Sequence, residues 1–133
     1  AKGFRTDPFA FDADGHLCIH EVGNNADGEA MNCHIESAEI EVDADGSRQF
    51  LIDRIVPDVT MSNSTTLAVK FKSRKYPNAP EITKGPFNVV QNTEKISTRV
   101  KGRQIAIRYE SSGIDDEWAL GDFRINAQVD SVR

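Results

Sequence analysis

Apolar and polar residues alternate along most of this chain with a period of two, which is typical of β-strands that have one solvated face. The alternation is clearest in 66–74, where Leu67, Val69 and Phe71 share one face and lysines take the other. Similar segments, rich in β-branched and aromatic residues, lie at 16–22, 47–56, 94–100, 103–111 and 122–129. The pattern predicts an all-β protein with essentially no helix.

Strands with one apolar face have to cover a shared core, and so we expect an antiparallel β-sandwich, jelly-roll-like, of about eight strands. A chain of 133 residues suits a single domain, 1–133. Apolar side chains in the strongest strands are the predicted core: Phe71, Ile105, Ile107, Phe123 and Ile125.

The last sixteen residues contain the only tryptophan, Trp118, followed by an alternating strand. We expect Trp118 to cap one end of the core, with Gly121 allowing the backbone to bend before that strand. The carboxyl end is therefore predicted to be structural, and Trp118→Ala is expected to weaken the fold severely.

Two segments interrupt the regular pattern. Ile35 and Ile40 are an odd number of residues apart, so both face the core only if a β-bulge lies near 37–39. Residues 76–87 contain three prolines and a glycine, which predicts a long crossing loop there.

A short motif occurs three times, as DADG at 12–15 and 43–46 and as NADG at 25–28. Asp and Asn begin turns by bonding their own backbone, and Gly accepts a positive φ, so each copy is predicted to be a β-turn. Calcium binding is the alternative, although the EF-hand spacing of ligands fails at the fifth and sixth positions.

Cysteine and histidine offer the best candidate for site chemistry. His16, Cys18 and His20 share one face of a strand, and a hairpin closing through 23–28 would place Cys18 opposite Cys33. A zinc site with Cys18, His20 and Cys33 and a cross-strand disulfide are both open, beside reduced and packed cysteines. Two cysteines are too few for a disulfide scaffold, and we expect no metal or cofactor.

The net charge of −5 conceals an asymmetry between the halves. Residues 1–66 carry four Lys and Arg against thirteen Asp and Glu, and residues 67–133 carry twelve against eight. Either the strands of the two halves intermix, or the halves form opposite faces through which copies stack with salt-sensitive contacts. An acidic chain does not have the basic footprint of a DNA-binding domain, so we expect no specific nucleic-acid binding.

Known catalytic motifs are absent: no GxSxG, phosphate loop, GxGxxG or HExxH is present. Carboxylates are plentiful, but no nucleophile, base and orienting group occur together, so we expect no enzyme. No apolar run approaches the ~20 residues of a membrane-spanning helix.

The order of segments resembles a known family. Four segments together resemble the carboxy-terminal region of large virion proteins of tailed bacteriophages, commonly short-tailed ones: FDADGHLCIHEVGNNADG, IESAEIEVDADGSRQFLIDRIVPDV, KFKSRKYPNAPEITKGPFNV and EKISTRVKGRQIAIRYESS. Residues 74–87 resemble the family's RRYPQ...TKGPF. The end of the chain resembles its closing WxLGxxRxDxQPDGxR through Trp118, Leu120, Gly121, Phe123 and Arg124, but 129–131 replace the Pro-Asp-Gly turn.

That resemblance implies a structural protein of the tail or head-to-tail assembly, such as a nozzle or hub. It implies a virion location after synthesis in the bacterial host cytoplasm, with other copies in a ring and neighbouring virion proteins as partners. Residues 1–28 resemble the last hairpin of a preceding propeller-like body. The loops containing Asn63, Tyr76, Asn78 and Lys84 are the candidate interface. A receptor- or carbohydrate-binding module at the tail tip is the alternative.

Overall fold

A computed structural model describes residues 8–19, 23–42 and 48–131 of the chain, the side chains of the last two excepted. The described residues form an all-β fold with no helix, as predicted. They contain thirteen strands rather than about eight, because several strands have only two to four residues. The strands are β1 (Phe9–Phe11), β2 (Leu17–Ile19), β3 (Asn25–Ala26), β4 (Glu29–Ala30), β5 (Cys33–Glu36), β6 (Gln49–Val56), β7 (Val59–Met61), β8 (Leu67–Arg74), β9 (Ile82–Val89), β10 (Ile96–Gly102), β11 (Gln104–Ser111), β12 (Trp118–Leu120) and β13 (Arg124–Ser131).

All six strands predicted from the period-two pattern are present, as β2, β6, β8, β10, β11 and β13. The larger sheet has the order β5-β11-β8-β9 and is antiparallel throughout. In β8 the buried and half-buried positions alternate along all eight residues. Branched and aromatic side chains thus fill one face of this sheet, and charged side chains the other.

The second sheet has the order β10-β6-β13 and is extended by the two-stranded ribbon β12-β7. The two pieces adjoin because β7 follows β6 and β12 precedes β13. At the junction the N–H of Gly121 donates to the carbonyl of Asp58 over 2.7 Å. A Cβ on Gly121 would lie 2.7 Å from an Asp58 carboxylate oxygen, so glycine permits this close approach.

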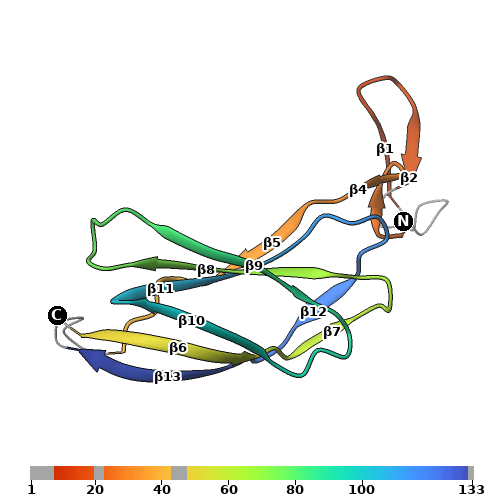
Figure 1. Cartoon of the computed structure of the whole chain (residues 1–133). Helices are drawn as coiled ribbons and strands as arrows, with labels where there is room; N and C mark the ends of the chain where they lie inside the picture. Colours follow the sequence, from red (N-terminus) through yellow and green to blue (C-terminus); the bar gives the residue numbers. More distant parts are fainter. Residues whose placement is uncertain (1–7, 20–22, 43–47, 132–133) are drawn as a thin grey trace, which may run out of the picture.

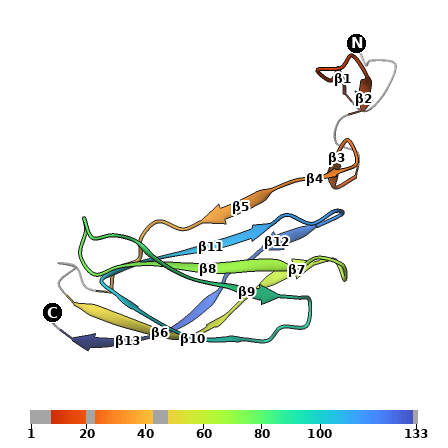
Figure 2. The same ribbon diagram turned by 45° about the horizontal axis from the view of Figure 1, so that its top comes forward.

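One hydrophobic cluster receives buried side chains from both sheets, and Figures 1 and 2 show the sheets as two layers. Phe71, Ile105 and Ile107 from the larger sheet are at most 1% exposed. Trp118, Phe123, Ile125 and Leu120 are partly buried and pack against this cluster. The core contains, from β6, β7, β8, β9, β10 and β11, the residues Phe50, Ile52, Ile55, Met61, Leu67, Val69, Phe71, Val89, Ile96, Val100, Ile105, Ile107 and Tyr109.

The predicted crossing loop at 76–87 is wrong over its second half, because Ile82–Val89 form β9 and pair with β8. β9 lies at the edge of its sheet, where a proline leaves no ladder hydrogen bond unmade. The register with β8 shifts between Val69 and Phe71, beside Gly85 and Pro86. Gly85 has a φ of 122° and its missing Cβ would meet the Val69 carbonyl oxygen at 2.7 Å. Gly85 and Pro86, which would not fit in a central strand, are therefore accommodated in a bulged strand at the edge of the sheet.

The bulge predicted between Ile35 and Ile40 is confirmed. Glu36 pairs with Arg108, whereas Ile40 pairs with Ile105, so the intervening segment contains one residue more than β11 does. Ser37 fills the irregular position and accepts a hydrogen bond from the Ile107 N–H on its Oγ at 3.0 Å.

Two small hairpins, β1-β2 and β3-β4, lie beyond one end of the two layers (Figures 1 and 2). The turns at 12–15 and 25–28 are confirmed: Gly15 has a φ of 86°, and Asp27 and Gly28 have φ values of 50° and 79°. Positive φ at two successive positions is the type I′ geometry that Asp-Gly favours. The third copy of the motif, 43–46, lies outside the described residues.

Candidate functional site

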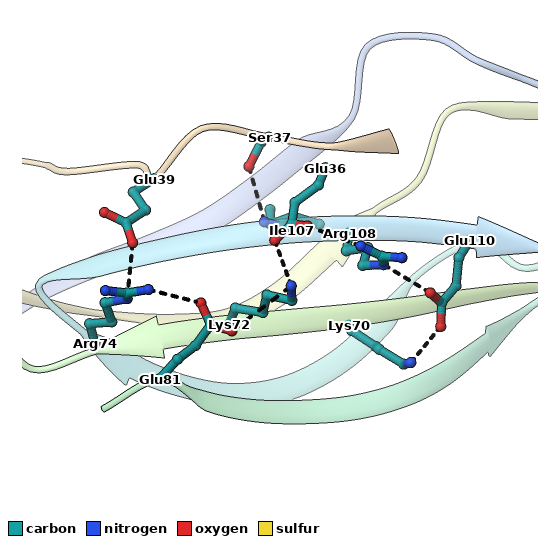
Figure 3. Close-up of polar contacts among 10 residues, drawn as sticks. All are labelled: Glu36, Ser37, Glu39, Lys70, Lys72, Arg74, Glu81, Ile107, Arg108 and Glu110. Carbon is teal, nitrogen blue, oxygen red and sulfur yellow. Dashed lines mark hydrogen bonds and ion pairs between the residues drawn. The ribbon is translucent and has the colours of Figure 1, made fainter. Parts of the chain in front are cut away.

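Charged side chains on the outer face of the larger sheet are paired with one another (Figure 3). The Nζ atom of Lys72 lies 2.9 Å from Oε1 of Glu36, and Arg108 bonds Glu36 and Glu110 at 3.2 and 2.8 Å. Hydrogen bonds from Lys72 and Lys70 are the main causes that lower the pKa of Glu36 and of Glu110, respectively. The bond to Glu110 is the main cause that raises the pKa of Arg108.

Arg74 continues this network at the end of β8. Its Nε atom lies 3.1 Å from Glu39 and its Nη2 atom 3.4 Å from Glu81. Acidic residues of the first half of the chain thus pair with basic residues of the second half within one molecule. Among the described residues this arrangement favours intermixed strands over two halves that form opposite faces.

The two cysteines lie in different parts of the fold, so the predicted opposition of Cys18 and Cys33 is wrong. β2, with Cys18, pairs with β1, whereas β5, with Cys33, pairs with β11. Both thiols are free. The segment 23–28 instead forms part of the separate hairpin β3-β4. The equal distance of the two cysteines from this turn does not determine which strands pair. Of the predicted zinc ligands, His20 lies outside the described residues, and Cys18 and Cys33 lie on strands with different partners.

Cys33 belongs to a short chain of polar contacts that ends at the tryptophan. The indole Nε1 of Trp118 donates to the Ser111 Oγ over 2.9 Å, and the Cys33 Sγ lies 3.0 Å from that hydroxyl. An indole N–H only donates, so the Ser111 hydroxyl is free to donate to sulfur. This contact orients the half-buried Trp118 ring at the end of the core.

Asp12 organises the turn of the first hairpin. Its Oδ1 accepts the backbone N–H groups of Asp14 and His16 at 3.0 and 2.7 Å, and its Oδ2 lies 2.9 Å from Nδ1 of His16. The backbone N–H of His16 is the main cause that lowers the pKa of Asp12. These bonds are the self-bonded turn predicted for the motif.

Two groups of side chains in the hairpins have spacing suited to a metal ion. They are Asp12, Asp14 and His16, and Asp12, Cys18 and Asp27, and within each group one donor atom per residue lies within 4.8 Å of the others. Neither group is the one predicted. The repeated motif was the available signal, because it supplies Asp12 and Asp27, but only the folded chain places them together.

The carboxylates at 115–117 hold the second hairpin to the body of the fold. The N–H of Asp115 donates to Asn25 Oδ1 at 2.6 Å, and Asn25 Nδ2 donates back to the Asp115 carboxylate. Asn24 Nδ2 lies 3.4 Å from Glu117, while Asp116 accepts the N–H of Gly113 at 2.7 Å. Each of these acids thus has a structural role in the loop.

The residues predicted as an interface do not form one surface. Asn63 precedes β8, whereas Tyr76 and Asn78 follow it, so they lie at opposite ends of that strand (Figure 1). Lys84 lies on β9, and its Nζ donates to the Arg99 carbonyl. All four side chains are exposed.

A different surface carries exposed apolar side chains. Phe9 pairs with Ile19 and Phe11 with Leu17 across the first hairpin, so all four lie on one face of it. We name these four residues the apolar hairpin face. Their exposed fractions are 43%, 48%, 72% and 60%, respectively. The alternation along 16–22 predicts a strand that contains Leu17 and Ile19, but nothing in that pattern indicates that their face is exposed.

A shallow hollow of about 450 Å³ lies between β5 and β12. Trp118 and Ile35 contribute apolar surface, and Asn24, His34 and Glu117 contribute polar groups. Ile35 lies on the core side of β5 but remains 51% exposed, because this end of the larger sheet is not covered.

No protein-family model and no curated protein matches the sequence. Within the part of the chain that the structure describes, no helix is long and apolar enough to cross a membrane.

Proposed function

We propose that this protein is a structural component of a bacteriophage virion, in the tail or head-to-tail assembly, and that it acts by protein–protein assembly. The sequence resemblance to virion proteins supports the class of protein. Assembly is supported by the exposure of the apolar hairpin face, where four large apolar side chains on one small hairpin are in contact with water. Exposed apolar patches of this kind mark interaction sites.

The proposed architecture for this role is a β-sandwich, jelly-roll-like in its connections. Support comes from the single cluster of buried side chains that the two sheets share. Such a body is rigid, and it presents the two small hairpins at one end as attachments for a neighbour.

In this proposal the apolar hairpin face packs on another copy or on a neighbouring virion protein. Burial of apolar surface stabilises such contacts by roughly 25 cal/mol per Å². Because the described charges of the larger sheet pair within the molecule, assembly through the hairpin depends only weakly on salt. Assembly through the apolar hairpin face is thus proposed in place of the salt-sensitive stacking of oppositely charged faces.

Sedimentation velocity over a range of concentrations tests the proposal. We expect concentration-dependent oligomers of the wild-type chain that persist at high salt. The double variant Phe11→Ser, Leu17→Ser removes the two most exposed members of the face and should leave a monomer. Tyr76→Ser is the matched control, since Tyr76 is 53% exposed at the other end of the body. A wild-type monomer at all concentrations, or equal loss in the control, contradicts assembly through this face.

Carbohydrate or receptor binding at a tail tip is the second candidate. It is favoured by the hollow that combines the Trp118 ring with Asn24, His34 and Glu117, since sugars bind aromatic faces flanked by polar groups. A glycan array probed with the wild-type protein and with Glu117→Gln decides it. Binding that the substitution abolishes supports this function, and an array without signal removes it.

A further inference from the structure

Three side chains from three separate segments converge between the two amino-terminal hairpins. Asp12 follows β1, Cys18 lies in β2, and Asp27 lies in the turn between β3 and β4. One donor atom from each lies within 4.8 Å of the other two. They line a hollow of about 560 Å³, to which Ala10 and Met31 also contribute.

The register of the hairpin explains why Cys18 faces this hollow. Cys18 pairs with Ala10, and successive strand residues point to opposite faces, so its thiol lies on the face opposite the apolar hairpin face. Its hydrogen-bond contact within the described chain is a long one, 3.7 Å to the His16 carbonyl. The sulfur is thus available as a ligand.

Negative charge in this hollow is poorly balanced. In the described parts of the chain, the Asp27 carboxylate makes no hydrogen bond or ion pair, and the basic group beside Asp12 is the imidazole of His16, 2.9 Å away. A divalent cation held between these carboxylates and the thiol would balance their charge.

We propose that Asp12, Cys18 and Asp27 bind a divalent transition-metal ion of the zinc class. The thiolate selects zinc or cobalt over calcium and magnesium, which take oxygen ligands only. Three protein ligands leave a fourth tetrahedral position for water. His16 and the backbone N–H groups that bond Asp12 hold its carboxylate in place as an outer shell.

The ion joins the hairpin β1-β2 to the hairpin β3-β4. The second hairpin is itself held to the body through Asn25 and Asp115. Metal binding therefore orders the first hairpin relative to the two layers. The proposed metal site does not depend on the proposed virion function, because all three of its ligands come from one chain and no partner is needed.

Titration of the reduced, metal-free protein with Co²⁺ under anaerobic conditions tests the site. We expect one equivalent to bind with a sulfur-to-cobalt charge-transfer band in the near ultraviolet and with visible bands of tetrahedral intensity. Zinc should displace the cobalt and abolish the bands. Cys18→Ser should lose the charge-transfer band, and Asp27→Asn should weaken binding about tenfold or more.

The chain offers matched controls for both variants. Cys33→Ser removes the other cysteine, which lies on β5 and contacts Ser111 of β11, and should leave the spectrum unchanged. Glu29→Gln removes a nearby exposed carboxylate with the same change of charge and should leave the affinity unchanged. Far-ultraviolet circular dichroism checks that each variant is folded. If Cys18→Ser is unfolded, the cobalt affinity of Asp27→Asn tests the site instead.

Several results overturn the proposal. These are failure of the wild-type chain to bind cobalt, binding without a thiolate band, a band that survives Cys18→Ser, and a band that Cys33→Ser removes. The last two would assign the metal to the other thiol or to adventitious binding.

Discussion

Replacement of Tyr109 by phenylalanine should stabilise the protein. The side chain is 1% exposed, and its ring lies 5.8 Å from that of Phe123, an arrangement that phenylalanine preserves. The hydroxyl oxygen is buried and has no hydrogen-bond partner among the described residues. Burial of an unsatisfied hydroxyl costs about 1 to 3 kcal/mol, so Tyr109→Phe should raise the free energy of unfolding by about 1 to 2 kcal/mol after allowance for the small void.

The same residue predicts a distinctive dependence on alkaline pH. Burial raises the pKa of Tyr109 from 10.0 to about 12. Between these values the unfolded chain has lost the phenolic proton and the folded chain keeps it, so stability falls as pH rises through the interval. The full slope for one group is about 1.4 kcal/mol per pH unit, which amounts to about 2 to 3 kcal/mol over the interval. Tyr109→Phe should lack this loss.

Urea unfolding at neutral pH and at several alkaline values measures both effects. In thermal unfolding at neutral pH we expect the melting temperature to rise by about 4 to 8 °C. Tyr76→Phe is the control, since Tyr76 is the only other tyrosine and is 53% exposed. The reasoning is refuted if Tyr109→Phe is less stable than the wild type by 1 kcal/mol or more, or if its alkaline slope equals that of the control.

Three further predictions concern stability. Trp118→Ala removes a half-buried ring and its hydrogen bond to Ser111, and should lower the free energy of unfolding by about 2 to 4 kcal/mol. An unchanged midpoint in urea unfolding would count against the capping role of Trp118. Gly85→Ala places a Cβ against a backbone oxygen at positive φ and should cost about 2 kcal/mol or more, whereas Gly15→Ala, with open space around it, should cost about 1 kcal/mol; equal losses would contradict the close approach. The hydrogen bond from Lys72 lowers the pKa of Glu36 from 4.5. The pair therefore stabilises the fold above pH 4.5, and this stabilisation is lost as the pH falls through the lowered pKa. Glu36→Gln should flatten the acid side of the curve of stability against pH. An unchanged curve would show that the pair contributes nothing.

The strand prediction succeeded where a local signal was strong. In β8 the period of two decides which side chains are buried, and in β11 it does so except at Ala106, which is buried on the other face. A strand that slips by one residue would expose its whole apolar face. The bulge between Ile35 and Ile40 follows from the same requirement, because only an extra residue restores the phase. The turns at 12–15 and 25–28 follow from the backbone chemistry of Asp and Gly.

Prediction failed where pairing partners are distant in the sequence. Cys33 belongs to β5, whose neighbour is β11, more than seventy residues away, and no local pattern distinguishes that partner from β2. β9 was missed because Pro86 excludes a central strand but not an edge strand, and the sequence of a strand does not show its position in the sheet. The group proposed to bind a metal was missed for the same reason, since Asp12 and Asp27 come from different hairpins.

By itself the sequence determined the all-β class, the faces of the main strands and the two described Asp-Gly turns, because each depends on neighbours within a few residues. Only the tertiary structure decided which strands lie side by side, which charges pair on the larger sheet, and which apolar, carboxylate and thiol side chains gather at the amino-terminal hairpins. Those features depend on contacts between distant segments, whose free energy arises only when the whole chain has folded.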